Sequence, residues 1–225
     1  MAQYLSSLLP TREAPATPLV LDLACGTGNV SAALVTNGFD VAAIDISQQM
    51  LSRARRKNPR VGFVRGDLRK LPFRGTFDGV VCLSFSLSYL TIPDDLRGLV
   101  SNLHRITRKG APVILDVIRP EALDSDWLQR EAARWEAKGI QFDFRWLSKP
   151  NRLYSIGYSP RRSGRDGVWR EAHVGRAYTA QELHDLFEGR GLFKLEASSV
   201  LDASCGTSHL SYYVATRSGA DVGSP

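Results

Sequence analysis

Two carboxylates and a short run of small residues are the parts of this sequence best suited to binding a ligand. Asp22 lies inside an apolar run, and a series of small residues follows from Ala24 to Gly28, with Gly26 at its centre. Small residues let a backbone loop pass close to a ligand, and glycine tolerates positive φ angles. Asp45 ends a second apolar run, where a carboxylate can accept hydrogen bonds from both hydroxyls of a ribose. The pattern therefore predicts a site for a ribose-containing ligand.

The glycine spacing argues against a dinucleotide as this ligand. A dinucleotide loop needs Gly-x-Gly-x-x-Gly, in which the helix N-terminus faces a pyrophosphate, but the third position counted from Gly26 is Ser31. Asp22 would also repel a pyrophosphate. The same carboxylate suits a ligand whose nearby end carries ammonium and sulfonium charges. The alternative for Asp22 is that it caps backbone amides of the glycine loop, as acids near turns often do.

Short apolar runs alternate with longer helix-like segments through the first half of the chain, and these elements would position the carboxylates. Runs that are apolar throughout are typical of strands in a parallel sheet that is covered on both faces. Right-handed crossovers between such strands give a doubly wound fold. The runs are Leu19–Leu23, Val41–Ile46, Val61–Val64, Phe77–Leu83 and Pro112–Ile118, and the helix-like segments are Asn29–Asn37, Ser47–Asn58 and Asp94–Thr107.

Local signals mark the ends of several helices. Ser47 stands where an N-cap residue is favoured, and Asn58, followed by a proline, ends the same helix. Pro120 suits the first turn of a further helix, which we expect to run through Trp127 to about Lys138.

Residues 140–178 differ in composition from the residues before them, with more aromatic and arginine residues and more turn signals. Apolar residues at 142–147 and at 153–158 indicate antiparallel strands joined by turns. Thr179 and Glu182 then form a capping box that opens a helix. We expect this helix at Ala180–Gly189 and two further strands near Leu192–Val200 and Ser208–Thr216.

The sequence therefore predicts one α/β domain over residues 1–225, built on a Rossmann-like, doubly wound sheet. This sheet is expected to be mostly parallel with an antiparallel last strand. An antiparallel β insertion at residues 140–178 would be mounted on the domain.

Five motifs follow one another over residues 19–118. They are Val20–Gly28, Val41–Ser47, the acidic loop Arg65–Phe73 with its Leu-Pro-Phe, the fourth-strand motif Phe77–Cys82, and the helix-to-strand turn Leu103–Ala111. Each motif alone would be weak, but in this order and with this spacing the sequence resembles the class I S-adenosylmethionine-dependent methyltransferases of the small-molecule type. The sequence departs from the family at Ala24, where many members have glycine.

The resemblance implies S-adenosyl-L-methionine as the cofactor and assigns roles to individual residues. Asp22 would border the methionine portion, and Asp45 would bind the ribose. Asp67 would meet the adenine amino group, and the loop Leu83–Tyr89 would line the methyl end. The residues expected to bind the cofactor are Asp22, Ala24, Gly26, Asp45, Ile46, Met50, Gly66, Asp67, Leu68 and Leu83.

The β insertion is the expected acceptor-binding region, with the pocket between Trp146 and Tyr178. His173 could deprotonate or orient an acceptor, because an imidazole exchanges protons near neutral pH, and Tyr178 is the second candidate catalytic residue. The alternative for His173 is a structural role. Five arginines could hold an anionic acceptor or RNA, namely Arg161, Arg162, Arg165, Arg170 and Arg176.

Composition bears on the partners and the compartment. The formal charge is +6 with a pI near 9.4, which could favour nucleic acid, an anionic membrane or an anionic substrate, although a solvated basic surface is the favoured explanation. No apolar run reaches the ~20 residues needed to cross a bilayer, and no signal peptide is recognised. The three cysteines lie far apart without a CxxC pair, so we expect no metal site and a cytoplasmic location.

We expect a small molecule as the methyl acceptor. An RNA or protein methyltransferase is the first alternative, and a non-catalytic cofactor-binding partner subunit is the second. A homodimer is a further alternative. Only Met1–Pro18 precede the first strand, whereas relatives usually carry a longer segment that closes over the cofactor, so a second subunit could cover the site instead.

Overall fold

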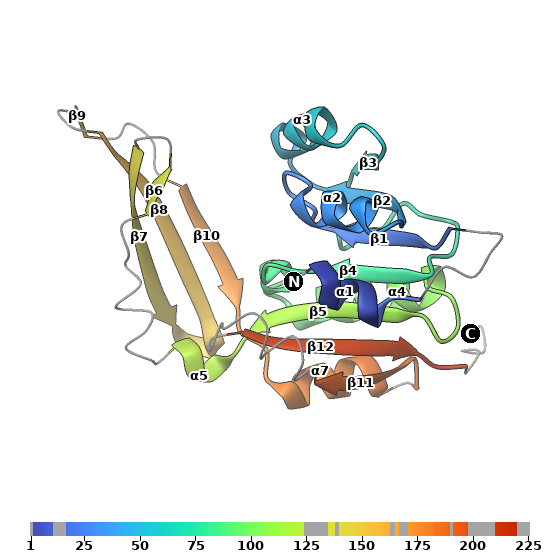
Figure 1. Cartoon of the computed structure of the whole chain (residues 1–225). Helices are drawn as coiled ribbons and strands as arrows, with labels where there is room; N and C mark the ends of the chain where they lie inside the picture. The colour runs from blue at the N-terminus through green and yellow to red at the C-terminus, as the bar shows by residue number, and fades with distance from the viewer. Residues whose placement is uncertain are drawn as a thin grey trace.

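The computed structural model describes residues 2–10, 17–123, 135–137, 140–162, 165–166, 171–189, 191–197 and 210–219. Its main body is a seven-stranded sheet in the order β11-β12-β5-β4-β1-β2-β3 (Figure 1). The parallel strands are β1 (Leu19–Leu23), β2 (Asp40–Asp45), β3 (Gly62–Arg65), β4 (Gly79–Cys82) and β5 (Pro112–Ile118). Strand β12 (Leu210–Arg217) runs antiparallel to both β5 and β11 (Phe193–Ala197). The predicted Rossmann-like sheet with an antiparallel last strand is confirmed.

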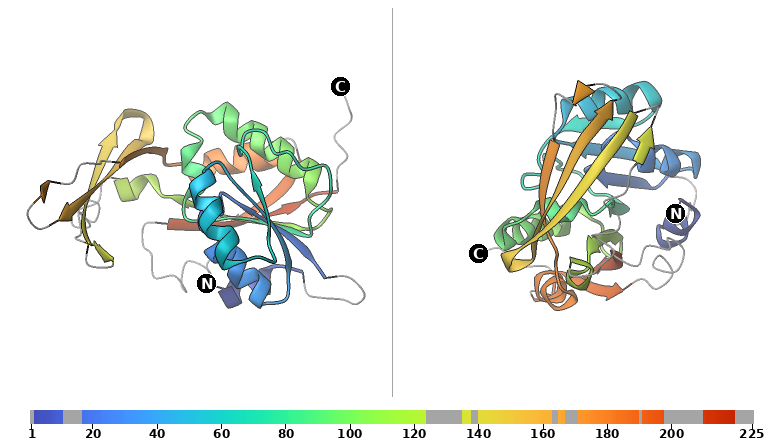
Figure 2. Two further views of the ribbon diagram at one scale, coloured as in Figure 1. Left: turned by 90° about the horizontal axis from the view of Figure 1, so that it is seen from above. Right: turned by 90° about the vertical axis from the view of Figure 1, so that its left-hand side faces the viewer.

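Helices cover both faces of this sheet (Figure 2). One face packs against α4 (Pro93–Ile106) and α7 (Ala180–Glu188), and the other against α1 (Ala2–Leu8), α2 (Asn29–Thr36) and α3 (Gln48–Lys57). Along each strand, successive side chains point to opposite faces of the sheet. In β1, Leu21 and Leu23 belong to the first apolar cluster and Val20 to the second. A short helix, α5 (Pro120–Leu123), and two 3₁₀ turns, η1 (Ser86–Tyr89) and η2 (Pro150–Arg152), complete the helical elements among the described residues.

The local capping signals act as the sequence predicts. The Ser47 hydroxyl accepts a hydrogen bond from the Met50 N–H at 3.3 Å and begins α3. At α7, the Thr179 side chain accepts from the Glu182 N–H at 3.1 Å, while the Glu182 carboxylate accepts from the Thr179 N–H at 3.0 Å. Both bonds of the capping box are therefore present.

A second, antiparallel sheet stands at the end of the main sheet where the parallel strands finish (Figure 1). Its strand order is β10-β8-β7-β6, with β9 paired to β8. The strands are β6 (Trp135–Ala137), β7 (Ile140–Lys149), β8 (Leu153–Arg162), β9 (Arg165–Asp166) and β10 (Glu171–Arg176). The base of this sheet is continuous with the main core, because Tyr154 and Ile156 are buried in the same apolar cluster as Ile118 and Tyr212.

The helix expected from Pro120 to about Lys138 is confirmed at its first turn and is wrong near its end. Helix α5 ends at Leu123, residues 124–134 lie outside the described residues, and Trp135–Ala137 is a strand. Ala137 pairs with Ile140, so a two-residue connection joins β6 to β7. Pairing with β7 gives the backbone of β6 hydrogen-bond partners, and this hairpin overrides the helical pattern. The expected strand ends at 198–200 and 208–209 also lie outside the described residues.

Candidate functional site

The direction in which the chain adds strands reverses between β1 and β4, which are neighbours in the sheet. The chain proceeds from β1 to β2 and β3 on one side, and from β4 to β5 on the other. In open α/β sheets, ligands bind beyond the carboxyl ends of the strands where the order reverses in this way. The loops that follow β1 and β4 meet at that point.

The loop after β1 is open on one side and tightly packed on the other. Gly26 has a φ of +54°, and a Cβ at this position would meet no heavy atom within 4 Å. Gly28 has a φ of +76°, and a Cβ there would lie 3.0 Å from Asn58 Nδ2 and 3.2 Å from Ala54 Cβ. Gly28 is therefore needed for close packing on α3, whereas Gly26 borders open space. Ala24 also takes a positive φ of 52°, which is uncommon for a residue with a side chain.

Asp45 ties this loop to the start of α3. Its Oδ2 accepts a hydrogen bond from the Gly26 N–H at 2.7 Å, and its Oδ1 accepts from the Ser47 N–H at 2.8 Å. Each carboxylate oxygen can accept more than one hydrogen bond, so both retain acceptor capacity. Next to it, Ile46 and Met50 expose 63% and 39% of their surfaces, an unusual exposure for large apolar residues. A carboxylate beside an apolar surface suits a nucleoside.

Asp22 lies deeper than the other predicted cofactor residues. It is 2% exposed, and its Oδ2 accepts a hydrogen bond from the Ser31 hydroxyl at 2.5 Å. Burial raises the pKa of Asp22 to about 7, and the hydrogen bond from Ser31 lowers it by a smaller amount. The carboxyl group therefore joins the end of β1 to α2, and its contact with a cofactor stays a prediction.

The loop after β3 lies beside Asp45. The Gly66 N–H donates to the Asp45 backbone carbonyl at 3.0 Å, and a Cβ on Gly66 would lie 2.6 Å from Ile44 Cδ1. Asp67 forms an ion pair with Arg69 at 2.5 Å, and hydrogen bonding to that guanidinium lowers the pKa of Asp67. Leu68 packs against the core. The loop is thus joined to the backbone of Asp45 through Gly66, and the contacts of Gly66, Asp67 and Leu68 with a cofactor stay predictions.

The loop after β4 is held by an acid that the sequence analysis missed. Ser84 and Phe85 take positive φ angles of 61° and 48°. Asp116 of β5 accepts hydrogen bonds from both of their N–H groups, at 2.9 and 2.6 Å. Asp116 is 2% exposed, and burial raises its pKa to about 7. An acid inside a strand that is otherwise apolar was the available signal, because burying a carboxyl is costly without hydrogen bonds. Leu83, which begins this loop, is buried.

His173 reaches the segment after β4 from the second sheet. Its Nδ1 lies 3.0 Å from the hydroxyl oxygen of Tyr89, the last residue of η1, and the two ring centroids are 5.7 Å apart in an edge-to-face arrangement. The structure therefore brings the predicted acceptor-side histidine to the carboxyl end of β4.

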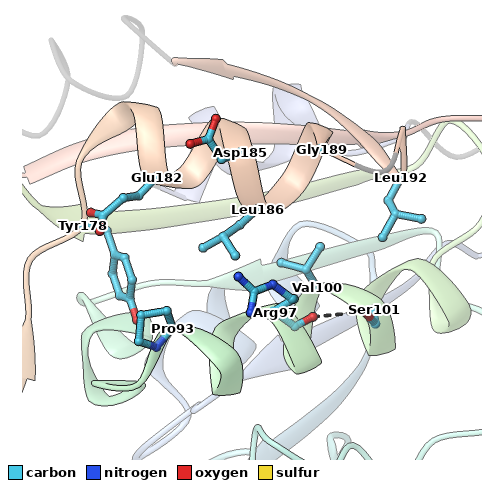
Figure 3. A pocket seen from close by; sticks show the side chains of 10 residues that line it. All are labelled: Pro93, Arg97, Val100, Ser101, Tyr178, Glu182, Asp185, Leu186, Gly189 and Leu192. Carbon is cyan, nitrogen blue, oxygen red and sulfur yellow. Dashed lines mark hydrogen bonds between the residues drawn. The ribbon is translucent and has the colours of Figure 1, made fainter.

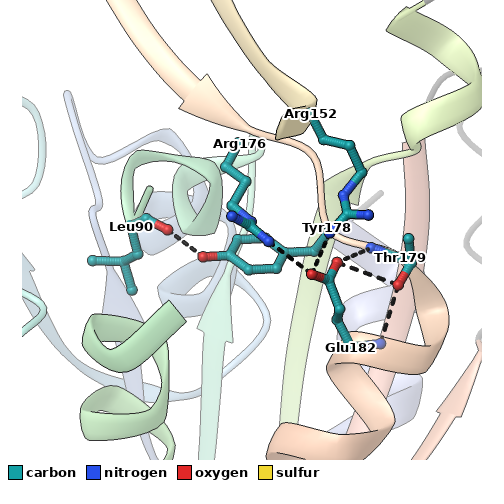
Figure 4. Close-up of polar contacts among 6 residues, drawn as sticks. All are labelled: Leu90, Arg152, Arg176, Tyr178, Thr179 and Glu182. Atoms are coloured by element: carbon teal, nitrogen blue, oxygen red, sulfur yellow. Dashed lines mark hydrogen bonds and ion pairs between the residues drawn. The ribbon is translucent and has the colours of Figure 1, made fainter. Parts of the chain in front are cut away.

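Tyr178 is placed differently, inside the protein. Its side chain is 1% exposed, and its hydroxyl donates a hydrogen bond to the Leu90 backbone carbonyl (Figure 4). Burial raises the pKa of Tyr178 to about 12. The Arg176 guanidinium lies over the Tyr178 ring at 5.3 Å from its centroid. This tyrosine holds the end of the segment that carries Tyr89.

The end of the second sheet is fixed to α7 by a cluster around Glu182 (Figure 4). The carboxylate of Glu182 accepts from Arg176 at 2.7 Å and also pairs with Arg152. Arg176 is thus engaged in an ion pair rather than available to an anionic acceptor. The side chains of the other four predicted arginines lie outside the described part of the structure.

Two cavities lie away from the loops after β1 and β4. The first, about 300 Å³, lies between α4 and α7 (Figure 3). The second, about 330 Å³, lies beside Asp78 and Arg108. Among the described residues, no group of three or more His, Cys, Asp or Glu side chains could hold a metal ion. No helix in the same residues has the length and apolar character that spanning a membrane requires.

Comparison with known proteins identifies relatives for part of the chain. The sequence profile of a family described as a methyltransferase domain matches residues 20–110. Over this methyltransferase region the chain is similar to that family, in agreement with the resemblance seen in the sequence. This methyltransferase region carries every predicted cofactor residue from Asp22 to Leu83, whereas His173 and Tyr178 lie outside it.

Similar proteins share the methyltransferase region. A demethylmenaquinone methyltransferase of Beutenbergia cavernae is 41% identical over 97 residues, which are 43% of this chain and 39% of that protein. The dTDP-3-amino-3,4,6-trideoxy-alpha-D-glucopyranose N,N-dimethyltransferase of Streptomyces venezuelae is 26% identical over 140 residues, 62% of this chain and 59% of that protein. This chain therefore spans less than two thirds of the length of these relatives.

A solved structure shows that the fold is shared over more of the chain. SAM-bound CalS10, an amino pentose methyltransferase from Micromonospora echinaspora, matches with a TM-score of 0.64 at 20% identity. The match covers 96% of this chain and 88% of that chain. At this identity, the match supports the methyltransferase fold alone.

Proposed function

We propose that this protein transfers a methyl group from S-adenosyl-L-methionine to a nitrogen, oxygen or carbon nucleophile of a small molecule. The observation that carries the proposal is the junction at the switch point, where Asp45 holds the open glycine loop by the Gly26 N–H. The matched methyltransferase region, and relatives named for methylating a quinone precursor and an amino sugar, support it.

The residues at the switch point fit the cofactor. Asp45 would accept hydrogen bonds from the ribose hydroxyls, because its oxygens keep acceptor capacity beyond the two backbone bonds. Ile46 and Met50 would cover the adenine with the apolar surface that they expose. The open side of Gly26 leaves room for the methionine portion. When bound there, the cofactor supplies an electrophilic methyl group on a sulfonium.

The protein's own contribution would be alignment and exclusion of water. Methyl transfer from a sulfonium removes charge at sulfur, so strong stabilisation of a developing anion is not required. A base is needed only where the nucleophile starts protonated. The loop after β4, whose Ser84 and Phe85 N–H groups donate to Asp116, would form the wall on the acceptor side. A cytoplasmic location is part of the proposal and rests on the cysteine content.

Binding measurements test the cofactor assignment. Calorimetry should show micromolar-range binding of S-adenosylmethionine and of its demethylated product, and no binding of NAD. The physical reason is the acid at Asp22 and the serine at position 31, which disfavour a pyrophosphate on the glycine loop. Heat with NAD, and none with the other two ligands, would remove the basis of the proposal.

We further propose that the acceptor binds between the segment after β4 and strand β10. Either His173→Ala or Tyr178→Phe should lower methyl transfer about tenfold or more, because His173 would act on the acceptor and Tyr178 holds the neighbouring segment. Cofactor affinity should stay within a factor of about two, since His173 and Tyr178 bond to Tyr89 and Leu90, at the other end of the loop after β4 from the predicted cofactor residue Leu83. Radiolabelled methyl transfer into metabolite extracts measures the first effect, and calorimetry the second.

Two results would contradict this placement of the acceptor. Normal turnover in both variants would move the acceptor pocket elsewhere, toward the N-terminal segment. Loss of cofactor binding in both would mean that β10 and its neighbours cover the cofactor itself.

A further inference from the structure

We propose that Tyr89 is a positioning residue that sets the tautomer of His173, so that His173 Nε2 takes a proton from the methyl acceptor. The inference rests on the proposed function and narrows it, because it requires an acceptor whose nucleophilic atom carries a proton, an amine or a hydroxyl. Tyr89 belongs to the 3₁₀ turn η1 of the main domain, and His173 belongs to strand β10 of the second sheet, 84 residues later in the chain.

The contact between the two residues is specific in both polar and ring geometry. The 3.0 Å separation of Tyr89 Oη and His173 Nδ1 is a hydrogen-bonding distance. The edge-to-face rings, with centroids 5.7 Å apart, fix the plane of the imidazole as well. A histidine held at one nitrogen presents the other nitrogen in a defined direction, and the bond at the first nitrogen decides which of the two carries the proton.

The strand register places His173 on the side of the second sheet that faces the main domain. His173 pairs with Ile156, and Gly175 pairs with Tyr154. Directly paired residues of antiparallel strands lie on the same face, and both Ile156 and Tyr154 are buried in the main core. Val174, one residue on, lies on the opposite face and is 44% exposed. His173 therefore lies on the face of the second sheet that is directed at the main domain, where it meets Tyr89 in the segment after β4.

The proposed proton transfer favours a hydrogen bond that His173 Nδ1–H donates and Tyr89 Oη accepts. When the acceptor's nucleophilic atom attacks the methyl carbon, the new bond to carbon forms, the carbon–sulfur bond breaks, and its electron pair stays on sulfur. The proton of the nucleophile passes to His173 Nε2, and the ring becomes an imidazolium with both nitrogens protonated. Its Nδ1–H must then donate, and Tyr89 Oη is already in place to accept. The proposed tautomer thus needs no rearrangement during the reaction.

Nuclear magnetic resonance of the ring nitrogens tests the tautomer directly and needs no acceptor. In protein labelled with ¹⁵N-histidine, the chemical shifts of the ring nitrogens should show a protonated Nδ1 and an unprotonated Nε2 on His173. Loss of one signal set in His173→Gln identifies it among the four histidines. In Tyr89→Phe the ring contact is kept and only the hydroxyl is lost, so His173 should shift toward the form protonated at Nε2. A contact that serves only packing would leave the tautomer unchanged.

Val174→Ala is the matched control, since it alters the same strand on its other face, and its histidine signals should match those of the wild type. An Nε2–H ring in the wild-type protein, or an unchanged tautomer in Tyr89→Phe, overturns the inference. Calorimetry with S-adenosylmethionine on the same samples keeps the two proposals apart. Absent binding by the wild type would defeat the proposed function whatever the tautomer, while normal binding with the wrong tautomer would defeat only the role of Tyr89.

Discussion

Replacing Asp45 by alanine is expected to weaken binding of S-adenosylmethionine by about 1.5–3 kcal/mol, roughly ten- to 150-fold. Charge-assisted hydrogen bonds to two ribose hydroxyls would be lost. The structure adds a second reason, because the same carboxylate holds the N–H groups of Gly26 and Ser47 at 2.7 and 2.8 Å. Without it, the glycine loop loses its tether to α3 as well. Calorimetry with the cofactor and with its demethylated product measures the change.

Asp45→Asn should have a smaller effect, since an amide oxygen can still accept from one of the two N–H groups while the amide nitrogen cannot. Asp40→Ala is a suitable control, because Asp40 is exposed at the opposite end of the same strand and should bind as the wild type does. A folded Asp45→Ala protein with unchanged affinity would show that Asp45 does not bind the ribose.

Asp22→Asn is expected to stabilise the ligand-free protein at about pH 8, by an amount on the order of 4 kcal/mol. Burial raises the pKa of Asp22 from its usual 3.8 to about 7. A carboxyl with a raised pKa contributes stability that is complete below the unfolded value of 3.8 and is lost as the pH rises through about 7. Asparagine keeps an oxygen to accept from the Ser31 hydroxyl and carries no charge. The stability gap between the variant and the wild type should therefore widen with pH.

Urea unfolding at two pH values measures this gap. By the same linkage, the gap should grow by about 2–3 kcal/mol between pH ~5 and pH ~8. The pKa of Asp116 is also raised, but Asp116 is present in both proteins, so its contribution to the pH dependence of stability cancels in the comparison. Asp40→Asn, at an exposed site, should show no such growth. A gap that stays constant with pH would mean that Asp22 ionises in the folded protein as freely as in the unfolded chain.

The sequence by itself determined the elements whose signals are local. Strands Leu19–Leu23 and Pro112–Ile118 have the predicted ends, because runs that are apolar throughout mark buried parallel strands. Ser47 caps α3, and the Thr179–Glu182 box opens α7, because each cap is made within three residues of the chain. Four of the five motifs share this property, since each lies at the end of one strand; the fifth, Leu103–Ala111, joins α4 to β5.

Tertiary structure decided the features that join distant residues. Asp116 holds the loop after β4 across 32 and 31 residues of chain, and Tyr89 meets His173 across 84. Caps and periodicity act over a few residues, whereas these contacts depend on which strands become neighbours. The sequence therefore indicated where a cofactor would bind, and only the folded chain placed the groups that would face the acceptor.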